Sequence, residues 1–576
     1  MLFRTLTAPC RFLVLLALAC AAPISASAAI PPVGDSPFAV ALAAPPASDP
    51  RDPATGNRLA IVSGGYDALL LRIHLIRHAK TSIAIQTFIW TNDECGRLMI
   101  YELIEAARRG VRVRILADHM FSDQDPDTVA FLATVHPNFE LKHYRPAMSR
   151  LKPSLYHTIF SAIRSFRDTN QRMHNKVMLI DGALLLTGGR NIENTYFDHS
   201  TGMNFRDRDV LVAGPAVRAA SASFDEFWNY RHAVESRELR DVHKAIEQGT
   251  FKRYPTRHYY EFGPHFTTLD REASEGALIR ERFVARLQPV RRATFISDEP
   301  GKSKNSAATA RITQALRETL ERARTSVVMQ TPYLVLSNPA QNLVRAMQAK
   351  NPGLQIHIST NSFASTDNLL AYSANYRLRN RYVEDLKLLV HEFKPHPASL
   401  ETLFPRYSAM RALAEKAKLE RPPFLCLHAK SLVVDDATAF VGSYNLDPRS
   451  ENLNTEVGLL IEDERFAAEL RAEIERDMRP ENSWAIARRP LPLRLDVVNG
   501  LVDGILSIAP IDVWPIQNTS SYELRPGATP VPAGHPAFYE NYREVGSFPG
   551  TEGLLSQKEI LTRLYKAVGS PLTPVL

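Results

Sequence analysis

Short apolar runs alternate with a segment of helical period in the first third of this chain. Ser82–Trp90 is largely apolar and β-branched, L-M-I-Y-E-L-I-E-A-A-R-R has apolar residues at helical spacing, and Val111–Ala117 is a second apolar run. Strand, helix and strand in this order predict a β-α-β unit with a parallel strand pair. The pattern therefore favours the α/β class, and 576 residues leave room for two or more domains.

The same unit recurs later in the chain. The segment A-K-T-S-I-A-I-Q-T at residues 79–87 is echoed by A-R-T-S-V-V-M-Q-T at residues 323–331, 244 positions later. Gly110, before the next predicted strand, is echoed by Gly353 at nearly the same interval. These landmarks indicate an internal duplication, so two similar α/β halves are expected. We expect them to divide near residues 285–305, where S-D-E-P-G-K-S-K-N-S is typical of an exposed linker.

A frame of six polar and glycine positions also occurs once in each half. The intervals are identical in the two copies, which are His174, Lys176, Asp181, Gly188, Gly189 and Asn191, and His428, Lys430, Asp435, Gly442, Ser443 and Asn445. In each copy an apolar run after the lysine predicts a strand, the aspartate a hairpin turn, and the next apolar run the returning strand. Because residues two apart on a strand point the same way, histidine and lysine should emerge side by side, with the asparagine brought back next to them.

These residue types suit a phosphoryl group. Lysine and asparagine can neutralise and hydrogen-bond the non-bridging oxygens, and glycine allows close approach of the backbone. The imidazole can then attack phosphorus or shuttle a proton. Surface strand residues without a function would explain one copy of the frame, but not two copies with matching returns. The aspartates lie in the predicted turns, where support of the hairpin is their expected role.

At these residues the chain resembles the phospholipase D superfamily. H-N-K-V-M-L-I-D and H-A-K-S-L-V-V-D match its H-x-K-x4-D signature, and the flanks G-G-R-N, R-D-R-D-V-L-V-A-G-P and G-S-Y-N-L-D-P-R-S resemble the C-type enzymes of its bacterial cardiolipin synthase branch. The resemblance covers roughly residues 65 to 490. It implies two homologous α/β/α sandwich halves with mixed central sheets and an active site at their interface.

The frame and the resemblance together give the expected site. The catalytic motif residues are His174, Lys176, Asp181, His428, Lys430 and Asp435, and the substrate-binding residues are Asn191, Asn445, Ser443 and Gly189. The resemblance implies that Asp209 and Glu456 hold the two imidazoles, with Asp207 expected on the same strand face as Asp209. It also implies that His174 is the nucleophile and His428 the acid. Because Gly189 stands where the other copy has Ser443, a hydroxyl contact with phosphate is expected on one side only.

The implied reaction is transfer of a phosphatidyl group through a phosphatidyl-histidine intermediate. An alcohol such as the glycerol end of phosphatidylglycerol would accept the group to give cardiolipin, whereas water would give phosphatidic acid. A nuclease-type phosphodiesterase and an inactive phosphate-binding scaffold are the alternatives, and two full motifs in an exported chain count against both. The expected partner is a phospholipid such as phosphatidylglycerol or phosphatidylethanolamine, with no nucleic acid and no obligate protein partner. No cofactor or metal is expected, because two imidazoles and two ammonium groups supply the chemistry.

The N-terminus has the pattern of an export signal. Arg4 and Arg11 accompany an apolar core, Phe12–Ala22, and A-S-A at residues 26–28 is a small-residue cleavage site. The core is too short to span a bilayer. We expect a periplasmic or cell-envelope, membrane-associated protein, and attachment of lipid at Cys20 is a second possibility. The mature chain would keep an excess of positive charge, which suits anionic substrates or an anionic membrane face.

The expected domain organisation follows from these features. Residues 1–28 form a signal peptide, 29–58 a Pro/Ala-rich linker, 59–290 the first phospholipase D-like domain, 291–490 the second, and 491–576 a C-terminal extension without assigned chemistry. Residues 141–176 carry eight Lys or Arg and one acidic residue, with apolar residues at helical spacing. This segment could dock on acidic lipid headgroups, or it could pack its apolar stripe on the domain and leave a solvated basic face.

Overall fold

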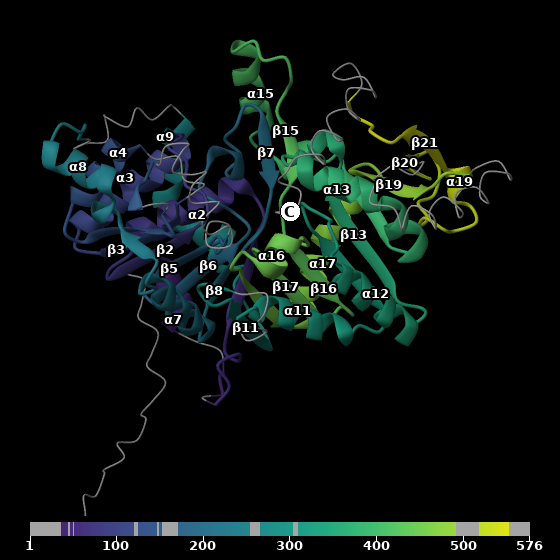
Figure 1. The fold of residues 1–576 in the computed structure, drawn as a ribbon, viewed down its shortest axis with the longest axis horizontal. Coiled ribbons are helices and arrows are strands. Elements are labelled where there is room, and N and C mark those ends of the chain that lie inside the picture. Colours follow the sequence, from purple (N-terminus) through teal and green to yellow (C-terminus); the bar gives the residue numbers. More distant parts are fainter. Residues whose placement is uncertain are drawn as a thin grey trace, which may run out of the picture.

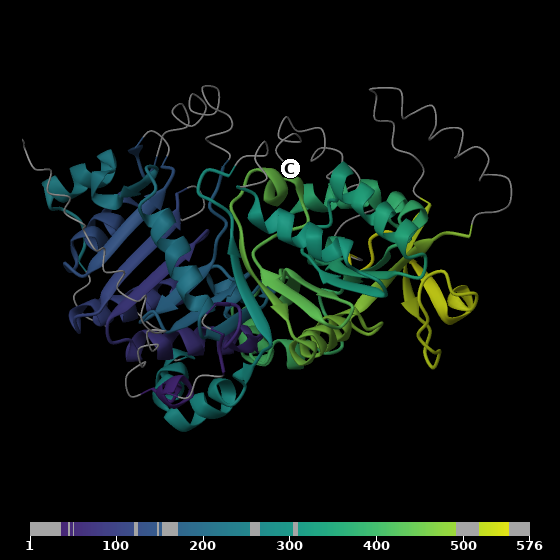
Figure 2. The ribbon, with the colours of Figure 1, turned by 90° about the horizontal axis from the view of Figure 1, so that it is seen from below.

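Two halves, each built around one twisted sheet, lie side by side in the computed structural model (Figures 1 and 2). The structure describes residues 36–43, 47–49, 51–119, 125–146, 149–152, 171–253, 265–302, 309–490 and 518–551. The signal segment and most of the basic segment predicted at 141–176 lie outside the described residues, as does the last part of the expected linker between the halves, from residue 303 onward.

The first sheet contains the first copy of the motif. Its strands follow the spatial order β10 (Gln288–Pro289), β1 (Arg58–Val62), β8 (Asp209–Ala213), β6 (Leu184–Gly188), β5 (Val177–Ile180), β2 (Ser82–Thr87), β3 (Arg112–Asp118), β4 (Phe139–Tyr144) and β9 (Ala233–Glu235). The predicted β-α-β unit is present, with β2 and β3 parallel. The predicted hairpin of the motif is β5 and β6, which pair antiparallel.

The second sheet repeats this arrangement. Its order is β11 (Arg292–Ser297), β18 (Val457–Glu462), β17 (Thr438–Gly442), β16 (Ser431–Val434), β12 (Ser326–Gln330), β13 (Gln355–Asn361), β14 (Leu389–Phe393), β19 (Ser483–Arg488), β20 (Thr519–Leu524) and β21 (Tyr542–Gly546). From β11 to β19 each strand takes the place of its counterpart from β1 to β9, with parallel and antiparallel neighbours in the same positions. Both sheets are therefore mixed, and the internal duplication covers the strands from β1 to β9 and from β11 to β19 in the spatial order, leaving β10, β20 and β21 without counterparts.

Helices cover both faces of each sheet. Those of the first half are α1 (Phe38–Ala43), α2 (Gly65–His78), α3 (Glu94–Arg108), α4 (Pro126–Thr134), α7 (Ala216–Trp228), α8 (Arg240–Gln248), α9 (His265–Ser274) and α10 (Gly276–Ile279). Those of the second are α11 (Arg311–Glu321), α12 (Asn338–Lys350), α13 (Leu369–Asn380), α14 (Leu400–Leu403), α15 (Tyr407–Lys416), α16 (Pro448–Asn452), α17 (Glu464–Met478) and α19 (Phe538–Asn541).

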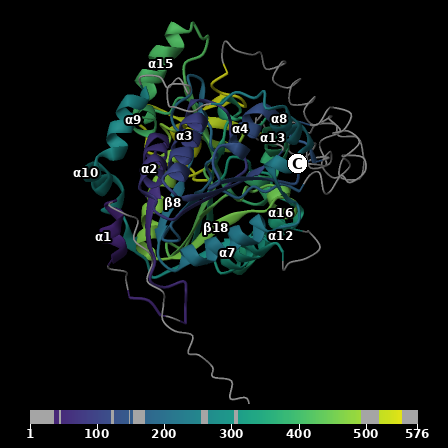
Figure 3. The same cartoon turned by 90° about the vertical axis from the view of Figure 1, so that its left-hand side faces the viewer.

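Strand alternation decides which helix each apolar residue meets. On β2, Ile83 and Ile85 belong to the core under α2 and α3, whereas Ala84 between them belongs to the core that contains α7. The core with α7 also contains α17 and residues from both sheets. The halves are thus joined through one continuous hydrophobic core, in which α7 contacts β11 of the second sheet. Figure 3 shows α7 on the side of β8 opposite α2 and α3.

Two predicted boundaries need correction. The segment 29–58 is not only a linker, because α1 buries Phe38 against the first half and Ser36 is hydrogen-bonded to His74 at 2.7 Å. The C-terminal extension is not separate from the second domain, because β20 and β21 extend the second sheet beyond β19. Its Pro- and Gly-rich composition gave no sign of these strands. The change from the first sheet to the second falls between Pro289 and Arg292.

Candidate active site

The two motifs meet at the junction of the halves, where two short parallel pairings cross from one half to the other. β7 (Met203–Arg206) pairs with β15 (Phe424–Leu427), and the register sets Arg206 opposite Leu427. A parallel bridge likewise sets Met173 opposite Thr455. In both cases the next residue on one chain segment is a motif histidine, and the next on the other is a carboxylate. Parallel pairing therefore places each histidine beside an acid of the opposite half.

Each imidazole is hydrogen-bonded to that acid. His174 Nδ1 lies 2.8 Å from a carboxylate oxygen of Glu456, and His428 Nδ1 lies 2.6 Å from a carboxylate oxygen of Asp207. All four side chains are buried. The bond to Nδ1 fixes the orientation of each ring and leaves Nε2 as the nitrogen available to a ligand.

The prediction for Asp209 is wrong, and Asp207 takes its place. Asp209 accepts a hydrogen bond from Arg72 at 3.0 Å and lies 3.4 Å from Arg190, inside the first half. The choice of Asp209 rested on the family resemblance, and strand alternation was expected to put both aspartates on one face. In the structure β7 ends at Arg206 and β8 begins at Asp209, so no continuous strand joins them. The register reveals the true equivalence: Gly188 pairs with Asp209 as Gly442 pairs with Gly458, which makes Asp207 the counterpart of Glu456.

The electrostatics favour ionised carboxylates and a neutral His174 ring. Burial alone would raise the pKa of Asp207, but the charges of Lys430 and His428 outweigh it and lower the pKa to about 2. The pKa of Glu456 is also lowered, because His174 and Lys176 outweigh its burial. Burial lowers the pKa of His174 to about 4 despite the opposing Glu456 charge. At neutral pH the His174 ring is therefore uncharged, and its Nε2 atom can act as a nucleophile.

One cavity of about 240 Å³ contains both imidazoles. The predicted residues that line it are His174, His428, Asn191 and Asn445. Among the described residues the Oδ1 atom of Asn445 is buried without a hydrogen-bond partner, so this amide can still bind a ligand. The residues that sequence reasoning missed include Phe88, Tyr196, Tyr333, Asp367, Asp447 and Arg449.

Tyr196 connects Asn191 of the first motif with His428 of the second. Its hydroxyl accepts a hydrogen bond from the Asn191 amide at 2.9 Å and lies 3.4 Å from His428 Nε2. The side-chain Oδ1 atom of Asn191 accepts a hydrogen bond from the backbone N–H group of Ile89. Asn191 is thus held in place by the protein, whereas Asn445 retains an open acceptor. No spacing in the sequence connects Tyr196 with the second motif, because their contact joins opposite halves.

The motif lysines lie behind the imidazoles and do not line this cavity. Lys176 donates to the backbone oxygen of His174 at 2.7 Å, and the Lys430 Nζ atom lies 2.7 Å from His428 Nδ1. Burial lowers the pKa of Lys176 to about 7 and also lowers the pKa of Lys430. A phosphoryl anion in the site would raise both values, because an opposite charge nearby favours the ammonium form.

Ser443 and Gly189 are in contact with the carboxylates, and a contact of either residue with phosphate stays a prediction. The Ser443 hydroxyl donates to Glu456 at 2.5 Å. At Gly189 an added Cβ would lie 2.1 Å from an oxygen of Asp207, so only glycine leaves room for this carboxylate. The difference between the two copies therefore concerns how each acid is held.

Asp181 and Asp435 lie at the far ends of the hairpins, away from the cavity. Each carboxylate accepts hydrogen bonds from three consecutive backbone N–H groups and one threonine hydroxyl at the start of the neighbouring strand. Both residues adopt positive φ in their turns, at 52° and 50°. Their position agrees with a role in supporting the hairpin and gives no contact with a reacting group.

Two further features bear on membranes and metals. Arg172, from the predicted basic segment, is buried and lies 3.4 Å from Asp118, so it is not part of a surface that could meet lipid headgroups. No helix in the described part of the chain combines the length and apolar character needed to cross a bilayer. Over the same ranges, no cluster of three or more His, Cys, Asp or Glu side chains is placed to hold a metal ion.

Comparisons with the sequences of known proteins agree with this architecture. The family model described as "Cardiolipin synthase, PLD-like domain" matches residues 72–228 and 316–478, one match in each half. Cardiolipin synthase C of Escherichia coli is 30% identical over 406 residues, which cover 70% of this chain and 80% of that protein. The major cardiolipin synthase ClsA of Bacillus subtilis is 24% identical over 459 residues, covering 78% and 76%. A phosphatidylserine synthase structure from Haemophilus influenzae aligns over 73% of this chain and 86% of its own, at 15% identity and a TM-score of 0.49.

The fold and the paired motifs define a phospholipase D-type enzyme with two homologous halves. The chain belongs to the family of cardiolipin synthase, phospholipase D-like proteins. It is accordingly a phosphatidyltransferase of the phospholipase D type, as the sequence resemblance implied.

Proposed function

We propose that this enzyme synthesises cardiolipin by transferring a phosphatidyl group to the terminal hydroxyl of phosphatidylglycerol. The observation that carries the proposal is the pair of imidazoles in one cavity, each bonded at Nδ1 to a carboxylate of the opposite half. Two histidines on one phosphodiester can divide attack and proton transfer between them. The cardiolipin synthases among the relatives support this particular product.

The first step breaks the bond between phosphorus and the leaving alcohol. Nε2 of His174 attacks phosphorus, the phosphorus–oxygen bond to the headgroup breaks, and His428 Nε2 gives its proton to the leaving oxygen. The neutral state of His174 favours this assignment of the nucleophile. The product is a phosphatidyl-histidine, whose phosphoryl oxygens face Asn191 and Asn445 in the cavity, while the motif lysines behind the rings supply positive charge.

The second step reverses these roles. The hydroxyl of the acceptor loses its proton to His428 Nε2, its oxygen attacks phosphorus, and the nitrogen–phosphorus bond breaks to regenerate His174. The open Oδ1 of Asn445 is an acceptor that can orient the incoming hydroxyl. Exclusion of water in favour of a lipid alcohol is what separates transfer from hydrolysis.

Lipid mass spectrometry tests the proposal directly. The purified enzyme is incubated with phosphatidylglycerol vesicles that contain phosphatidylethanolamine with acyl chains of a different mass. We expect cardiolipin, and the masses of its chains identify the donor. Phosphatidic acid without cardiolipin would assign hydrolysis instead. His174→Ala should abolish product, whereas His243→Ala on α8, an exposed position with its ring 61% accessible, is the matched histidine control.

A further inference from the structure

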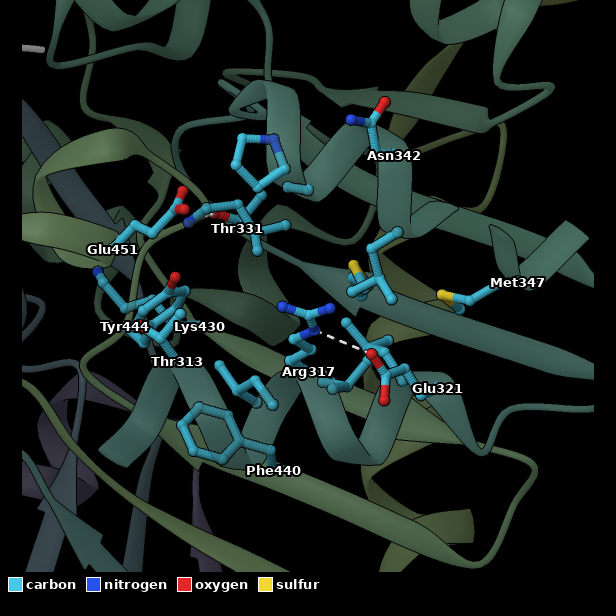
Figure 4. A pocket seen from close by; sticks show the side chains of 18 of the residues that line it. Thr313, Arg317, Glu321, Thr331, Asn342, Met347, Lys430, Phe440, Tyr444 and Glu451 are labelled. Atoms are coloured by element: carbon cyan, nitrogen blue, oxygen red, sulfur yellow. Dashed lines mark hydrogen bonds and ion pairs between the residues drawn. The ribbon is translucent and has the colours of Figure 1, made fainter. Parts of the chain in front are cut away.

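A second cavity, of about 710 Å³, lies between α11, α12 and the second sheet. Its size is within the range of about 300–1,000 Å³ of pockets that bind small molecules. Figure 4 shows Thr331, Tyr444 and Lys430 gathered toward one end, with Arg317 and Glu321 in front and Met347 at the other end. Its apolar wall is formed by Leu316, Leu320, Met329, Ala340, Leu343, Met347, Leu432, Phe440 and Leu446.

In the first half the equivalent cavity is almost completely filled. A residual space of only about 20 Å³ is lined by the equivalents of many of these residues, among them Ile85 for Met329, Met99 for Leu343 and Lys176 for Lys430. Three charged side chains fill it, because Arg72 and Arg190 converge on Asp209. In the second half their equivalents are Leu316, Tyr444 and Gly458, so the three charged groups are absent and the Phe440 ring lies against Gly458.

The exposure of the walls agrees with an open apolar site. Ile85 on β2 is 2% exposed and Met99 is fully buried, as expected for a packed core. Their counterparts Met329, on the interior strand β12, and Leu343 are only partly buried. Burying such surface stabilises a folded protein, so apolar surface kept open beneath two helices is a candidate binding site for an apolar ligand.

The cavity connects the surface with the catalytic motif. Charged groups mark the outer side, where Arg317 is hydrogen-bonded to Glu321 at 2.9 Å and both side chains are exposed. On the inner side the cavity reaches Lys430, the lysine of the second motif, and its neighbour Ser431. A ligand here would need a long apolar part, since the wall between these ends is made of Leu, Met, Phe and Ala side chains.

We propose that this cavity binds one fatty-acyl chain of a phospholipid. The inference rests on the proposed phospholipid chemistry, because a diacyl lipid held at the imidazoles must place its chains somewhere on the protein. It makes the two halves unequal: both give a histidine to the reaction, but only the second takes up hydrocarbon. The cavity then selects for chain length, and the first half has no room for such a chain because Arg72, Arg190 and Asp209 fill the equivalent place.

Ala346→Trp tests this assignment, with Ala349→Trp as the matched control. Both alanines are exposed on α12, but only Ala346 lines the cavity. Phosphatidylglycerol with a photoreactive diazirine at the end of one acyl chain is irradiated with each variant, and the labelled peptides are sequenced. Label should fall on α11 or α12 in the wild type and in Ala349→Trp, and be lost in Ala346→Trp. Equal thermal unfolding temperatures verify the fold.

Kinetic measurements show whether the acyl chain in the cavity belongs to the lipid that the enzyme converts. In mixed micelles Ala346→Trp should lower kcat/KM for dioleoyl phosphatidylglycerol about tenfold, the effect of losing burial of about two methylene groups, and leave dihexanoyl phosphatidylglycerol unchanged. Loss of label without this kinetic effect would still place a chain in the cavity, but one from a lipid that is not being converted. Label of equal strength on Ala346→Trp, or label outside α11 and α12, overturns the proposal. Labelling needs no turnover, so a failure of cardiolipin synthesis would be recognised separately.

Discussion

Replacing Asp207 by asparagine tests the crossed carboxylate–histidine pairs most directly. Asparagine keeps the shape of the side chain but removes the charge that lies 2.6 Å from His428 Nδ1. The negative charge of Asp207 raises the pKa of His428, against burial and the neighbouring Lys430, which lower it. Without that charge the pKa of His428 falls further, and the protonated ring becomes a scarcer acid at neutral pH.

The expected loss follows from the hydrogen bond. Hydrogen bonds to charged groups contribute about 1.5–3 kcal/mol. Asp207→Asn removes this stabilisation from protonated His428, so the rate of headgroup departure should fall by about 10- to 150-fold. The loss should depend on the leaving group, because a nitrophenol departs with little protonation whereas an alkyl alcohol does not. We therefore expect a large effect on phosphatidylglycerol and a small one on a nitrophenyl phosphodiester.

The assay compares kcat/KM for the two substrates over a range of pH. In the Asp207→Asn enzyme the limb of the profile that reports protonated His428 should move to lower pH. Asp209→Asn is the matched control, because it removes a buried charge two residues away that pairs with Arg72 and Arg190. Breaking such a buried pair costs up to about 3–5 kcal/mol of stability. The control should lower the thermal unfolding temperature and leave the ratio of the two substrates unchanged.

Two results would refute the reasoning. An equal loss on both substrates in Asp207→Asn would mean that Asp207 does not act through the acid. A changed substrate ratio in Asp209→Asn instead would support Asp209, the aspartate that the family resemblance had implied.

Three further predictions concern the roles and stability of other groups. His428→Ala should still release nitrophenol in the first turnover and accumulate phosphohistidine, whereas His174→Ala should do neither; acid-labile phosphate on His428 in the latter protein would reverse the roles. Asp181→Ala should lower the unfolding temperature by calorimetry while preserving the pH–rate profile, because its carboxylate holds backbone N–H groups outside the cavity; a shifted profile would contradict this. Burial lowers the pKa of His143 and of His391 to about 3, so stability present above the unfolded value of about 6.5 is lost as pH falls, by about 2 kcal/mol for each at pH 5; a pH-independent unfolding temperature would argue against neutral buried rings.

Local features of the chain were decided by the sequence. The interval from His174 to Asp181 and on to Asn191 fixed a hairpin, since strand length, turn and return are set by neighbouring residues. Its repetition at His428 predicted two halves meeting at one site. The offset of 244 positions between the repeated strands predicted equivalent β-α-β units, and the strand order shows that the equivalence extends across both sheets.

Contacts between distant segments were decided only by the tertiary structure. Asp207 and His428 are 221 positions apart, and Glu456 and His174 are 282 apart, so no local period could reveal that each acid serves the other half's histidine. The pairing of β7 with β15 sets the first contact, and the bridge from Met173 to Thr455 sets the second. Likewise, Leu316 and Arg72 hold equivalent positions in the repeat, but only packing shows that one leaves a cavity and the other fills it. Local periodicity records which face of a strand or helix is apolar, whereas the docking of two halves determines which groups finally share a site.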